Sequence, residues 1–415
     1  MLFISPIDLV KFARQKAPYY QRLYAHLPPE FDWSDVPIID KELFWEEKRA
    51  QPNDFITQSP FGGYVWSTGG STSQGNRVHI SNEDFAEECR FMSLAFTAAG
   101  LSHGDVVANL FHSGNLYASF LLTSQCLQLL PVTQLPILSH PPIARVVELC
   151  QEFSPNAILA PPTTLLKLAN YCKRHRITLN IEKLLYAGEH LYPDQRQELI
   201  DRFGSQQIRG FGYAAVDTGP IAAPVLAAPD RTYQPLNGYT YVELLDDYDE
   251  PIIQPGQRGR LVITNLGRRL SPVIRYPIGD IGEWSTPAGP QGPFRLHERS
   301  NLSFKFGRRI IFYHELRRIA QNVPGFTSNI QIIVDRQDGR STANIHVRPD
   351  LDGRDPQDAI ADFQEKFWLE YGDPTYAFIE ENNKDLIQVH LTDLEKFIFS
   401  PQSGKPIPII DRRKL

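Results

Sequence analysis

The chain has 415 residues, enough for roughly two to three folding units with a sizeable buried interior. Hydrophobic residues make up 42% and charged residues 22%, as in globular proteins, which argues against disorder and fibrous repeats. The formal net charge of -6 provides no basic footprint for nucleic acid or an anionic membrane. Binding of a nucleotide as a small ligand is not excluded, because it needs only a local pocket.

Targeting signals and cysteine usage favour a cytoplasmic protein. No stretch approaches the ~20 apolar residues that cross a bilayer, and the first residues turn charged too soon for a signal peptide. Cys89, Cys126, Cys150 and Cys172 are widely spaced and form no CxxC pair. We therefore expect them to be reduced and mostly buried.

Helical and strand patterns alternate from about residue 81 to 213, which predicts βα units around a mostly parallel sheet. The first helix has Ser81 and Asp84 as its start signal and Gly100 as its end. Further helices are expected over 141–153, 163–175 and 193–204, and strands over 106–111, 157–162 and 183–189.

The pattern changes after about residue 230, where short β-rich runs at 240–246, 258–266, 273–284 and 294–299 predict a β subdomain. From about residue 300, helical and strand patterns mix in an α+β arrangement. We expect helices over 314–323 and 356–371 and strands over 329–335 and 342–348.

A glycine- and hydroxyl-rich loop, "WSTGGSTSQGNR" at 66–77, follows a strand-like run. Successive backbone N–H groups in such a loop can converge on phosphate oxygens. A Walker loop is excluded, because Asn76 and Arg77 stand where its lysine and hydroxyl would be. Taken by itself the loop is as readily an exposed turn.

Other segments of the chain indicate a function for this loop, because they resemble the motifs of one family in the order in which that family has them. The loop resembles the [ST]-[SG]-G-[ST]-[ST]-G-x-P loop of the adenylate-forming superfamily, which activates carboxylates with ATP. The segments that resemble further motifs of that family are "LFHSG" (110–114), "YAGEHL" (186–191), "YAAVDTG" (213–219), "RYPIGD" (275–280) and "SPQSGKPIPIIDRR" (400–413). The N-terminal "FARQKAPYYQRLYAHL" and "VPIIDKELF" resemble the phenylacetate-CoA ligase branch, so the resemblance spans nearly the whole chain.

The resemblance implies an α/β fold with a large N-terminal domain over 1–298, which binds ATP and the acid and contains a β subdomain at about 230–298. A small mobile α+β lid domain is expected over 299–415. The loop would hold the β- and γ-phosphates through Thr68, Gly69, Gly70, Ser71 and Thr72. Two positions depart from the motif, because Ser73 replaces its last glycine and Gln74 its usual lysine, so that a nearby cation would have to come from Arg77.

The "YAAVDTG" segment would contact the nucleotide. Tyr213 matches the aromatic residue that stacks on adenine, although a tyrosine at a strand end also suits a core. Asp217 falls where the family has its Mg²⁺-binding glutamate, and a carboxylate suits this hard cation. Val216 replaces the threonine of the motif and removes a hydroxyl near the α-phosphate.

The "RYPIGD" segment supplies Asp280, which matches the aspartate that accepts hydrogen bonds from both ribose hydroxyls. An Asx turn after Gly279 explains the same residue without a ligand. Arg299 matches the arginine of the family's hinge, near Asn301, and a solvated arginine on a turn explains it equally well.

Lys405 matches the adenylation lysine, a point charge for the phosphate oxygens, and its alternative is a solvated lysine in a polar tail. Gly188 and Glu189 belong to the segment near adenine. His112 would face the carboxylate or the incoming nucleophile, and a packing histidine beside Phe111 is the alternative.

The implied function is ligation in two steps: a carboxylate and ATP give acyl-AMP and pyrophosphate, and a thiol, coenzyme A, then displaces AMP. The acid expected from the nearest branch is aryl or arylacetic, with Mg²⁺ as cofactor. One alternative hands the acyl group to an amine, a hydroxyl or a carrier protein, and another is a degenerate nucleotide-binding homologue, suggested by Ser73, Gln74 and Val216. A homodimer stays open, and the acid and the acceptor are not fixed by the sequence.

Overall fold

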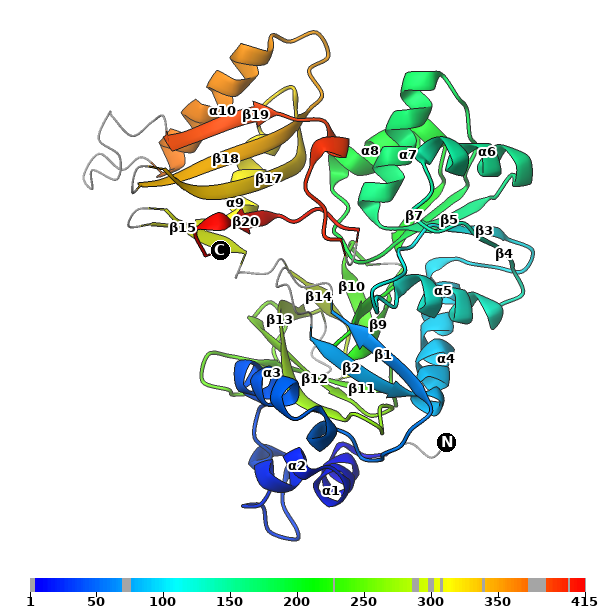
Figure 1. The fold of residues 1–415 in the computed structure, drawn as a ribbon, viewed down its shortest axis with the longest axis vertical. Coiled ribbons are helices and arrows are strands. Elements are labelled where there is room, and N and C mark those ends of the chain that lie inside the picture. Colours follow the sequence, from blue (N-terminus) through cyan, green and yellow to red (C-terminus); the bar gives the residue numbers. More distant parts are fainter. Residues whose placement is uncertain are drawn as a thin grey trace.

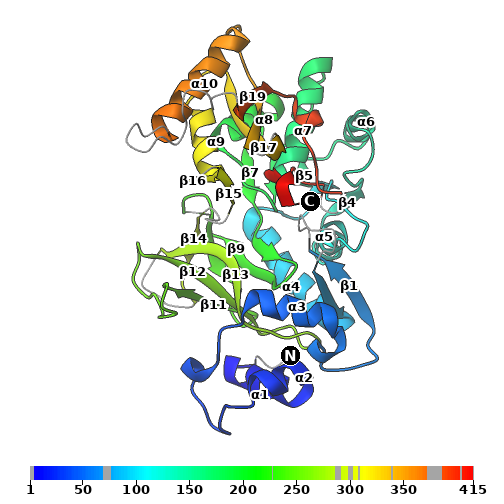
Figure 2. The same cartoon turned by 60° about the vertical axis from the view of Figure 1, so that its left-hand side comes forward.

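The computed structural model describes residues 4–68, 76–226, 228–285, 291–297, 302–306, 309–337, 340–371, 386–401 and 404–414. A large N-terminal domain and a small C-terminal domain make up the fold (Figure 1). Figures 1 and 2 agree that the C-terminal domain lies beside α7 and α8, at the end of the molecule opposite α1 and α2. The expected α/β fold class is confirmed.

A five-stranded parallel sheet, in the order β4-β3-β5-β6-β7, forms the middle of the N-terminal domain. Its strands are β3 (Val106–Asn109), β4 (Thr133–Pro136), β5 (Ala157–Ala160), β6 (Lys183–Tyr186) and β7 (Gln207–Gly210). Helices connect these strands, as the alternating sequence pattern predicts. The connecting or flanking helices are α4 (Asn82–Ala99), α5 (Ser119–Gln128), α6 (Ile143–Phe153), α7 (Pro162–His175) and α8 (Pro193–Phe203).

Both faces of the parallel sheet are covered. Ile158 and Leu184 point into a cluster with apolar residues of α6, α7 and α8, whereas Leu159 and Leu185 point into a cluster with α4 and α5. Successive residues of a strand face opposite sides, so these strands are apolar throughout. The Ser81 side chain caps α4 by accepting from the backbone of Asp84, and Gly100 ends it at φ 114°.

The β subdomain is a seven-stranded sheet in the order β11-β12-β13-β14-β10-β9-β8. Its strands are β8 (Tyr213–Ala215), β9 (Gly219–Pro224), β10 (Thr232–Pro235), β11 (Thr240–Leu245), β12 (Arg258–Asn265), β13 (Val273–Trp284) and β14 (Phe294–Leu296). The sheet therefore begins about 17 residues earlier than expected. Pro220 and Pro224 argue against a strand at β9 in the sequence, because proline has no backbone N–H to donate to a neighbouring strand.

The N-terminal helices α1 (Pro6–Lys16), α2 (Pro18–Leu23) and α3 (Lys41–Ala50) pack against this sheet in one hydrophobic cluster. The short helices Trp33–Asp35 and Pro52–Phe55 lie between and after them. A separate hairpin of β1 (Gly63–Ser67) and β2 (Arg77–Ser81) follows, and the phosphate loop predicted from the sequence connects its two strands.

The C-terminal domain has a four-stranded sheet in the order β19-β18-β17-β20 and the hairpin β15-β16. The strands are β15 (Ser303–Phe306), β16 (Arg309–Phe312), β17 (Phe326–Gln337), β18 (Arg340–Pro349), β19 (Ile387–Leu391) and β20 (Ile409–Asp411), and the helices are α9 (Tyr313–Gln321) and α10 (Pro356–Tyr371), with short turns at Leu394–Lys396 and Arg412–Lys414. Leu394 and Phe397 leave this domain and join the cluster under α6, α7 and α8. The expected boundary at 298/299 falls in a segment outside the described residues.

All four cysteines are buried and free of disulfides, as expected from their spacing. Within the described ranges, every helix is too short or too polar to cross a membrane.

Candidate active site

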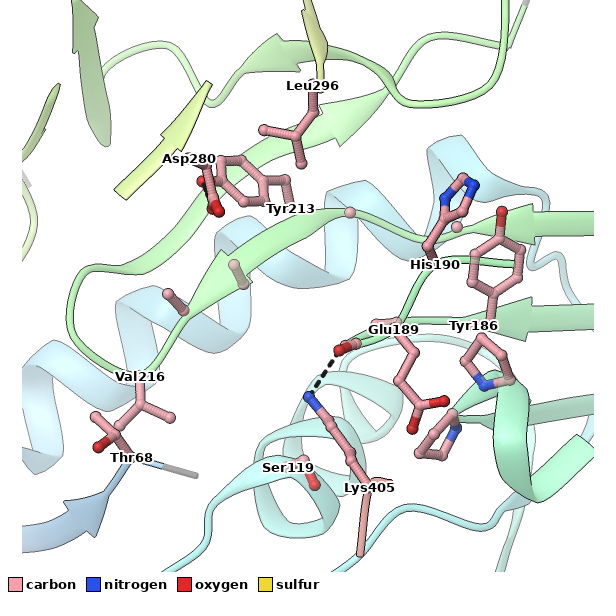
Figure 3. A pocket seen from close by; sticks show the side chains of 18 of the residues that line it. Thr68, Ser119, Tyr186, Glu189, His190, Tyr213, Val216, Asp280, Leu296 and Lys405 are labelled. Carbon is pink, nitrogen blue, oxygen red and sulfur yellow. Dashed lines mark hydrogen bonds between the residues drawn. The ribbon is translucent and has the colours of Figure 1, made fainter. Parts of the chain in front are cut away.

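A cavity of about 860 Å³ lies where the two domains meet. Segments that follow the parallel strands line it, together with the start of the β subdomain and the C-terminal segment around Lys405 (Figure 3). Crevices at the carboxyl ends of parallel strands are the usual ligand sites of open α/β sheets. Of the sequence-predicted residues, the cavity lining contains Thr68, Gly188, Glu189, Tyr213, Asp217, Asp280 and Lys405.

Tyr213 and Asp280 meet in this lining although they come from different strands. The Tyr213 hydroxyl donates to Oδ2 of Asp280 at 2.5 Å, and only 6% of Asp280 is exposed. Gly279, at φ 95°, takes a backbone conformation that favours glycine immediately before Asp280. The pair therefore presents an aromatic ring beside a carboxylate, which suits a nucleoside.

The buried side chain of Arg268 forms hydrogen bonds to the backbone of the loop that carries Val216 and Asp217. Nη1 of Arg268 donates to the carbonyl oxygens of Val216 and Asp217 at 3.0 and 2.9 Å, and its Nε donates to Glu88 at 2.6 Å. Burial raises the pKa of the Glu88 carboxyl, and the charge of Arg268 opposes that rise. The Tyr276 hydroxyl donates to Oδ2 of Asp217 at 2.7 Å, so the carboxylate is fixed at the cavity wall.

Thr68 and Asn76 form hydrogen bonds at the base of the glycine- and hydroxyl-rich loop. The Thr68 N–H donates to the carbonyl of Asn76 at 2.9 Å, and the Asn76 N–H donates to Oγ1 of Thr68 at 3.1 Å. Both residues line the cavity. The remaining predicted phosphate contacts, Gly69, Gly70, Ser71 and Thr72, lie outside the described residues, as do Ser73 and Gln74. Arg77 is exposed and is not among the residues that line the cavity.

Lys405 reaches across the cavity from the C-terminal segment. Its Nζ donates to the carbonyl of Gly188 at 2.9 Å (Figure 3). Gly188 has φ 84°, and a Cβ there would lie 2.5 Å from Nζ. The backbone conformation therefore favours glycine at this position, and a Cβ there would displace the end of the Lys405 side chain.

Glu189 follows Gly188 and is anchored to the first turn of α7. Its Oε2 accepts from the backbone N–H of Thr163 at 3.2 Å and from the Thr163 hydroxyl. Burial raises the pKa of the Glu189 carboxyl, and the Thr163 hydrogen bonds and the charge of Lys405 oppose that rise. This carboxylate gives the ammonium of Lys405 a neighbour of opposite charge.

His112 does not belong to the cavity lining. Its Nδ1 lies 3.2 Å from the Ser139 hydroxyl, and its ring lies against the His140 ring, with centroids 4.2 Å apart and the planes tilted by 33°. The ring also lies under the turn before Lys405, since a Cβ on Gly404 would be 3.2 Å from Nδ1. In this arrangement His112 contacts the segment that delivers Lys405. Arg299 lies outside the described residues.

Several lining residues were missed by the sequence reasoning. Lys41 donates from Nζ to the carbonyl of Ile278 at 2.8 Å and lies in the cavity wall, although the "VPIIDKELF" segment that contains it had been noted without a role. His190, Arg231 and Arg317 line the side nearest the C-terminal domain. The apolar part of the wall includes the aromatic residues Trp66, Phe85, Phe96, Phe111 and Phe211, beside aliphatic residues such as Met92 and Leu122.

The residues present fit a phosphate-bound Mg²⁺ ion better than a metal held by protein alone. Among the described residues, no group of three or more His, Cys, Asp or Glu side chains could hold a metal ion. Mg²⁺ commonly needs only one or two carboxylates when substrate phosphates complete its shell. Asp217 is such a single carboxylate in the cavity wall.

Comparison with solved structures gives the class of the fold, and no protein-family model matches the chain. A 2-hydroxyisobutyryl-CoA ligase in the postadenylation state has a TM-score of 0.73 at 18% identity, covering 99% of this chain and 88% of that one. The same ligase in the thioesterification state has a TM-score of 0.64 at 20% identity, covering 98% and 88%. The fold is that of adenylate-forming enzymes.

Curated relatives agree with this class. Indoleacetate–lysine synthetase of Pseudomonas savastanoi is 23% identical over 393 residues, which cover 91% of this chain and 90% of the relative. Phenylacetate-coenzyme A ligase of Pseudomonas putida is 22% identical over 241 residues, covering 55% of this chain and 54% of the relative. The chain is thus similar to adenylate-forming ligases in sequence over nearly its whole length and in fold.

Proposed function

We propose that this chain activates an aromatic carboxylic acid with ATP and transfers the acyl group to the thiol of coenzyme A. The observation that carries the proposal is the convergence of Lys405, Gly188, the Tyr213–Asp280 pair and Asp217 on one cavity. The sites proposed for the nucleotide and the acid thus share one cavity with the ammonium of Lys405.

The first step joins the acid to the α-phosphate. A carboxylate oxygen of the acid attacks the α-phosphorus of ATP, the bond to the β-phosphate oxygen breaks, and pyrophosphate leaves. Negative charge on the phosphoryl oxygens grows in this step, so positioned cations and N–H donors lower its barrier. Lys405 supplies a mobile cation, Thr68 and Gly69 to Thr72 supply the phosphate loop, and Mg²⁺ beside Asp217 would neutralise further phosphate charge.

The nucleoside would lie between the β subdomain and the loop after β6. In this proposal Tyr213 stacks on adenine beside Gly188 and Glu189, and Asp280 accepts from the ribose hydroxyls. The Tyr213–Asp280 hydrogen bond supports the assignment, because it sets the ring and the carboxylate at a fixed separation.

The aromatic wall of the cavity supports an aromatic acid. Phe85, Phe96 and Trp66 come from the α4 layer and the β1 strand, and Phe111 and Phe211 follow β3 and β7. Aromatic rings pack favourably in edge-to-face or offset contacts, and an apolar wall favours an apolar acyl group. The names of two relatives, indoleacetate–lysine synthetase and phenylacetate-coenzyme A ligase, each contain an aromatic acid.

In the second step the thiolate sulfur would attack the acyl carbon, and AMP leaves with the bonding pair of the carbon–oxygen bond. We further propose the division into residues 1–298 and 299–415, with Arg299 at the hinge and the C-terminal domain turning between the two steps. His112 would then act by docking the segment of Lys405 in the first step.

An amine acceptor is the second candidate. The alignment with indoleacetate–lysine synthetase covers nearly the full length of both chains, whereas the phenylacetate-CoA ligase of Pseudomonas putida aligns over about half. In that case the same acyl-AMP forms, and a lysine or another amine, in place of a thiol, displaces AMP.

The test is an ATP–pyrophosphate exchange screen over aromatic and aliphatic acids, followed by product analysis with coenzyme A, lysine or no acceptor. Exchange with an arylacetic acid and a thioester product would support the proposal. An amide product with lysine, without dependence on coenzyme A, would favour the second candidate. Nucleotide binding without exchange for any acid would contradict both.

A further inference from the structure

A buried side chain, Gln331 of β17, connects the two arms of the loop that carries Lys405. Only 2% of Gln331 is exposed. Its Nε2 donates to the carbonyls of Ile398 and Ile407, both at 2.8 Å, and its Oε1 accepts from the Ile398 N–H at 2.9 Å. One amide therefore joins the two arms of the segment 398–407, which we call the lysine loop.

Backbone hydrogen bonds also connect the two arms of the lysine loop. The Ile407 N–H donates to the carbonyl of Ile398 at 3.0 Å, and the Ser400 N–H donates to the carbonyl of Lys405 at 2.7 Å. Lys405 therefore follows a closed turn whose base is the Gln331 amide. Both amide N–H groups of Gln331 are used, and the backbone groups at the base of the loop would lose these partners if the amide were removed.

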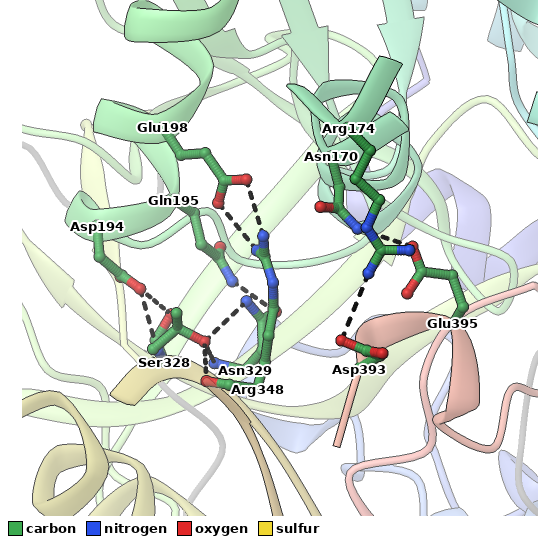
Figure 4. A network of polar contacts seen from close by, with 11 residues as sticks. Asn170, Arg174, Asp194, Gln195, Glu198, Ser328, Asn329, Arg348, Asp393 and Glu395 are labelled. Carbon is green, nitrogen blue, oxygen red and sulfur yellow. Dashed lines mark hydrogen bonds and ion pairs between the residues drawn. The ribbon is translucent and has the colours of Figure 1, made fainter. Parts of the chain in front are cut away.

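The strand that carries Gln331 is in turn tied to the N-terminal domain. Ser328 donates from its N–H and its hydroxyl to Asp194 of α8, both at 3.0 Å, and Gln195 of α8 donates to Asn329 at 2.8 Å (Figure 4). These contacts lie within three residues of Gln331 on β17. Strand β17 is therefore joined by hydrogen bonds to α8 at Ser328 and Asn329 and to the lysine loop at Gln331.

Gln331 itself does not line the cavity, whereas its neighbours Asn329 and Ile330 do. It is therefore no candidate for touching a substrate. We infer that Gln331 is a positioning residue, which sets the distance of the Lys405 ammonium from the loop after β6 during adenylation. The inference rests on the proposed function, because it assigns Lys405 to the first step.

Two variants separate positioning from general support of the fold. Gln331→Met keeps the length of the side chain and removes all three hydrogen bonds, and Gln331→Glu places a carboxylate against two carbonyl oxygens. Gln134→Met is the matched control, because Gln134 also donates a side-chain hydrogen bond, to Ser124 of α5, and neither lines the cavity nor contacts the lysine loop. The acid is the one that supports exchange in the wild type.

Three quantities are measured for each variant: the midpoint of thermal unfolding, kcat and KM for ATP in pyrophosphate exchange, and acyl transfer from synthetic acyl adenylate. We expect kcat for exchange to fall about 10- to 100-fold in both Gln331 variants, because small displacements of a catalytic group have effects of this size. KM for ATP and transfer from the adenylate should stay within about twofold, since neither depends on Lys405.

Exchange by Gln331→Met within about twofold of the wild type would overturn the inference while leaving the proposed function intact. An equal loss in both half-reactions, or unfolding of both variants, would also overturn it, because the role would then be structural. Failure of the wild type to exchange with any acid would instead overturn the proposed function.

Discussion

The ammonium of Lys405 lies 2.9 Å from the carbonyl oxygen of Gly188, a residue 217 positions earlier in the chain. This contact joins the end of the C-terminal segment to the loop that follows β6. Gly404, with φ 65°, immediately precedes the lysine, and Gly188 has no side chain that the ammonium would have to displace. In the proposed reaction, phosphate charge would develop near this ammonium.

Replacing Lys405 by alanine should remove the first half-reaction and keep nucleotide binding. The cation that stabilises the phosphoryl oxygens is lost, whereas Tyr213 and Asp280 are unchanged. We expect ATP–pyrophosphate exchange to fall by about 100-fold or more, which corresponds to about 3 kcal/mol. ATP affinity by calorimetry should change by less than about threefold. Lys396→Ala, at an exposed lysine of the same segment, is the control, and equal exchange in the two variants would contradict the role of Lys405.

Asp280→Ala should weaken ATP binding without unfolding the chain. The variant removes the proposed ribose acceptor and the partner of the Tyr213 hydroxyl. We expect an affinity loss of about 10-fold, the effect of one or two hydrogen bonds to a charged group. Tyr213→Phe removes the same hydrogen bond and keeps the carboxylate, so it should lose much less affinity. If ATP affinity is unchanged in Asp280→Ala, the residue serves only the turn after Gly279.

Local signals in the sequence predicted most of the parallel sheet. The start of α4 at Ser81 and its end at Gly100 depend on capping residues that lie next to the helix, so they can be recognised without tertiary contacts. Strand β9 escaped prediction because its two prolines contradict a strand pattern. In these elements, local chemistry determined whether a prediction was possible.

The candidate site was predictable only where a motif of the family survives. Lys405, Tyr213 and Asp280 stand in such motifs, whereas the Glu88–Arg268 pair joins residues 180 positions apart and follows no spacing rule. Lys41 belongs to a recognised segment, but its place in the cavity depends on how α3 packs against β13. Contacts of this kind come from tertiary packing and cannot be read from periodicity.

The ion pair between Glu198 and Arg348 should favour the docked arrangement of the two domains. Arg348 of β18 donates to both oxygens of Glu198 on α8, at 2.9 and 2.8 Å, and the side chains are 13% and 27% exposed (Figure 4). Because this arrangement brings Lys405 to Gly188, Arg348→Glu should slow pyrophosphate exchange about 3- to 10-fold through repulsion between two carboxylates. Transfer from synthetic acyl adenylate should not slow.

The reversed pair tests this explanation directly. Glu198→Arg combined with Arg348→Glu restores opposite charges at the same positions and should recover at least half of the lost exchange activity. The coupling of the two changes is measured by a double-mutant cycle. Arg145→Glu, at an exposed pair with Glu148 on α6, is a charge-matched control that should leave exchange unchanged. No recovery in the double variant would show that the pair does not set the docking.

His190 should make the folded chain sensitive to acid. Burial and, to a smaller extent, the charges of Arg231, Arg317 and Arg196 together lower the pKa of the imidazole from 6.5 to about 3. The unfolded chain takes up this proton below about pH 6.5, whereas the folded chain does so only near pH 3. The free energy of unfolding should therefore fall as pH decreases through this window, by at most about 1.4 kcal/mol per pH unit from this group.

Chemical denaturation of the wild type and His190→Gln between pH 7 and pH 4 measures this contribution. Glutamine does not titrate, so the variant should lose less stability on acidification than the wild type, and the difference between their free energies of unfolding should change in favour of the variant between pH 7 and pH 4. His103→Gln, at an exposed histidine, should follow the wild-type curve. Parallel curves for the wild type and His190→Gln would mean that the folded chain protonates His190 near its ordinary pKa, and the three arginines would then have no such effect on it.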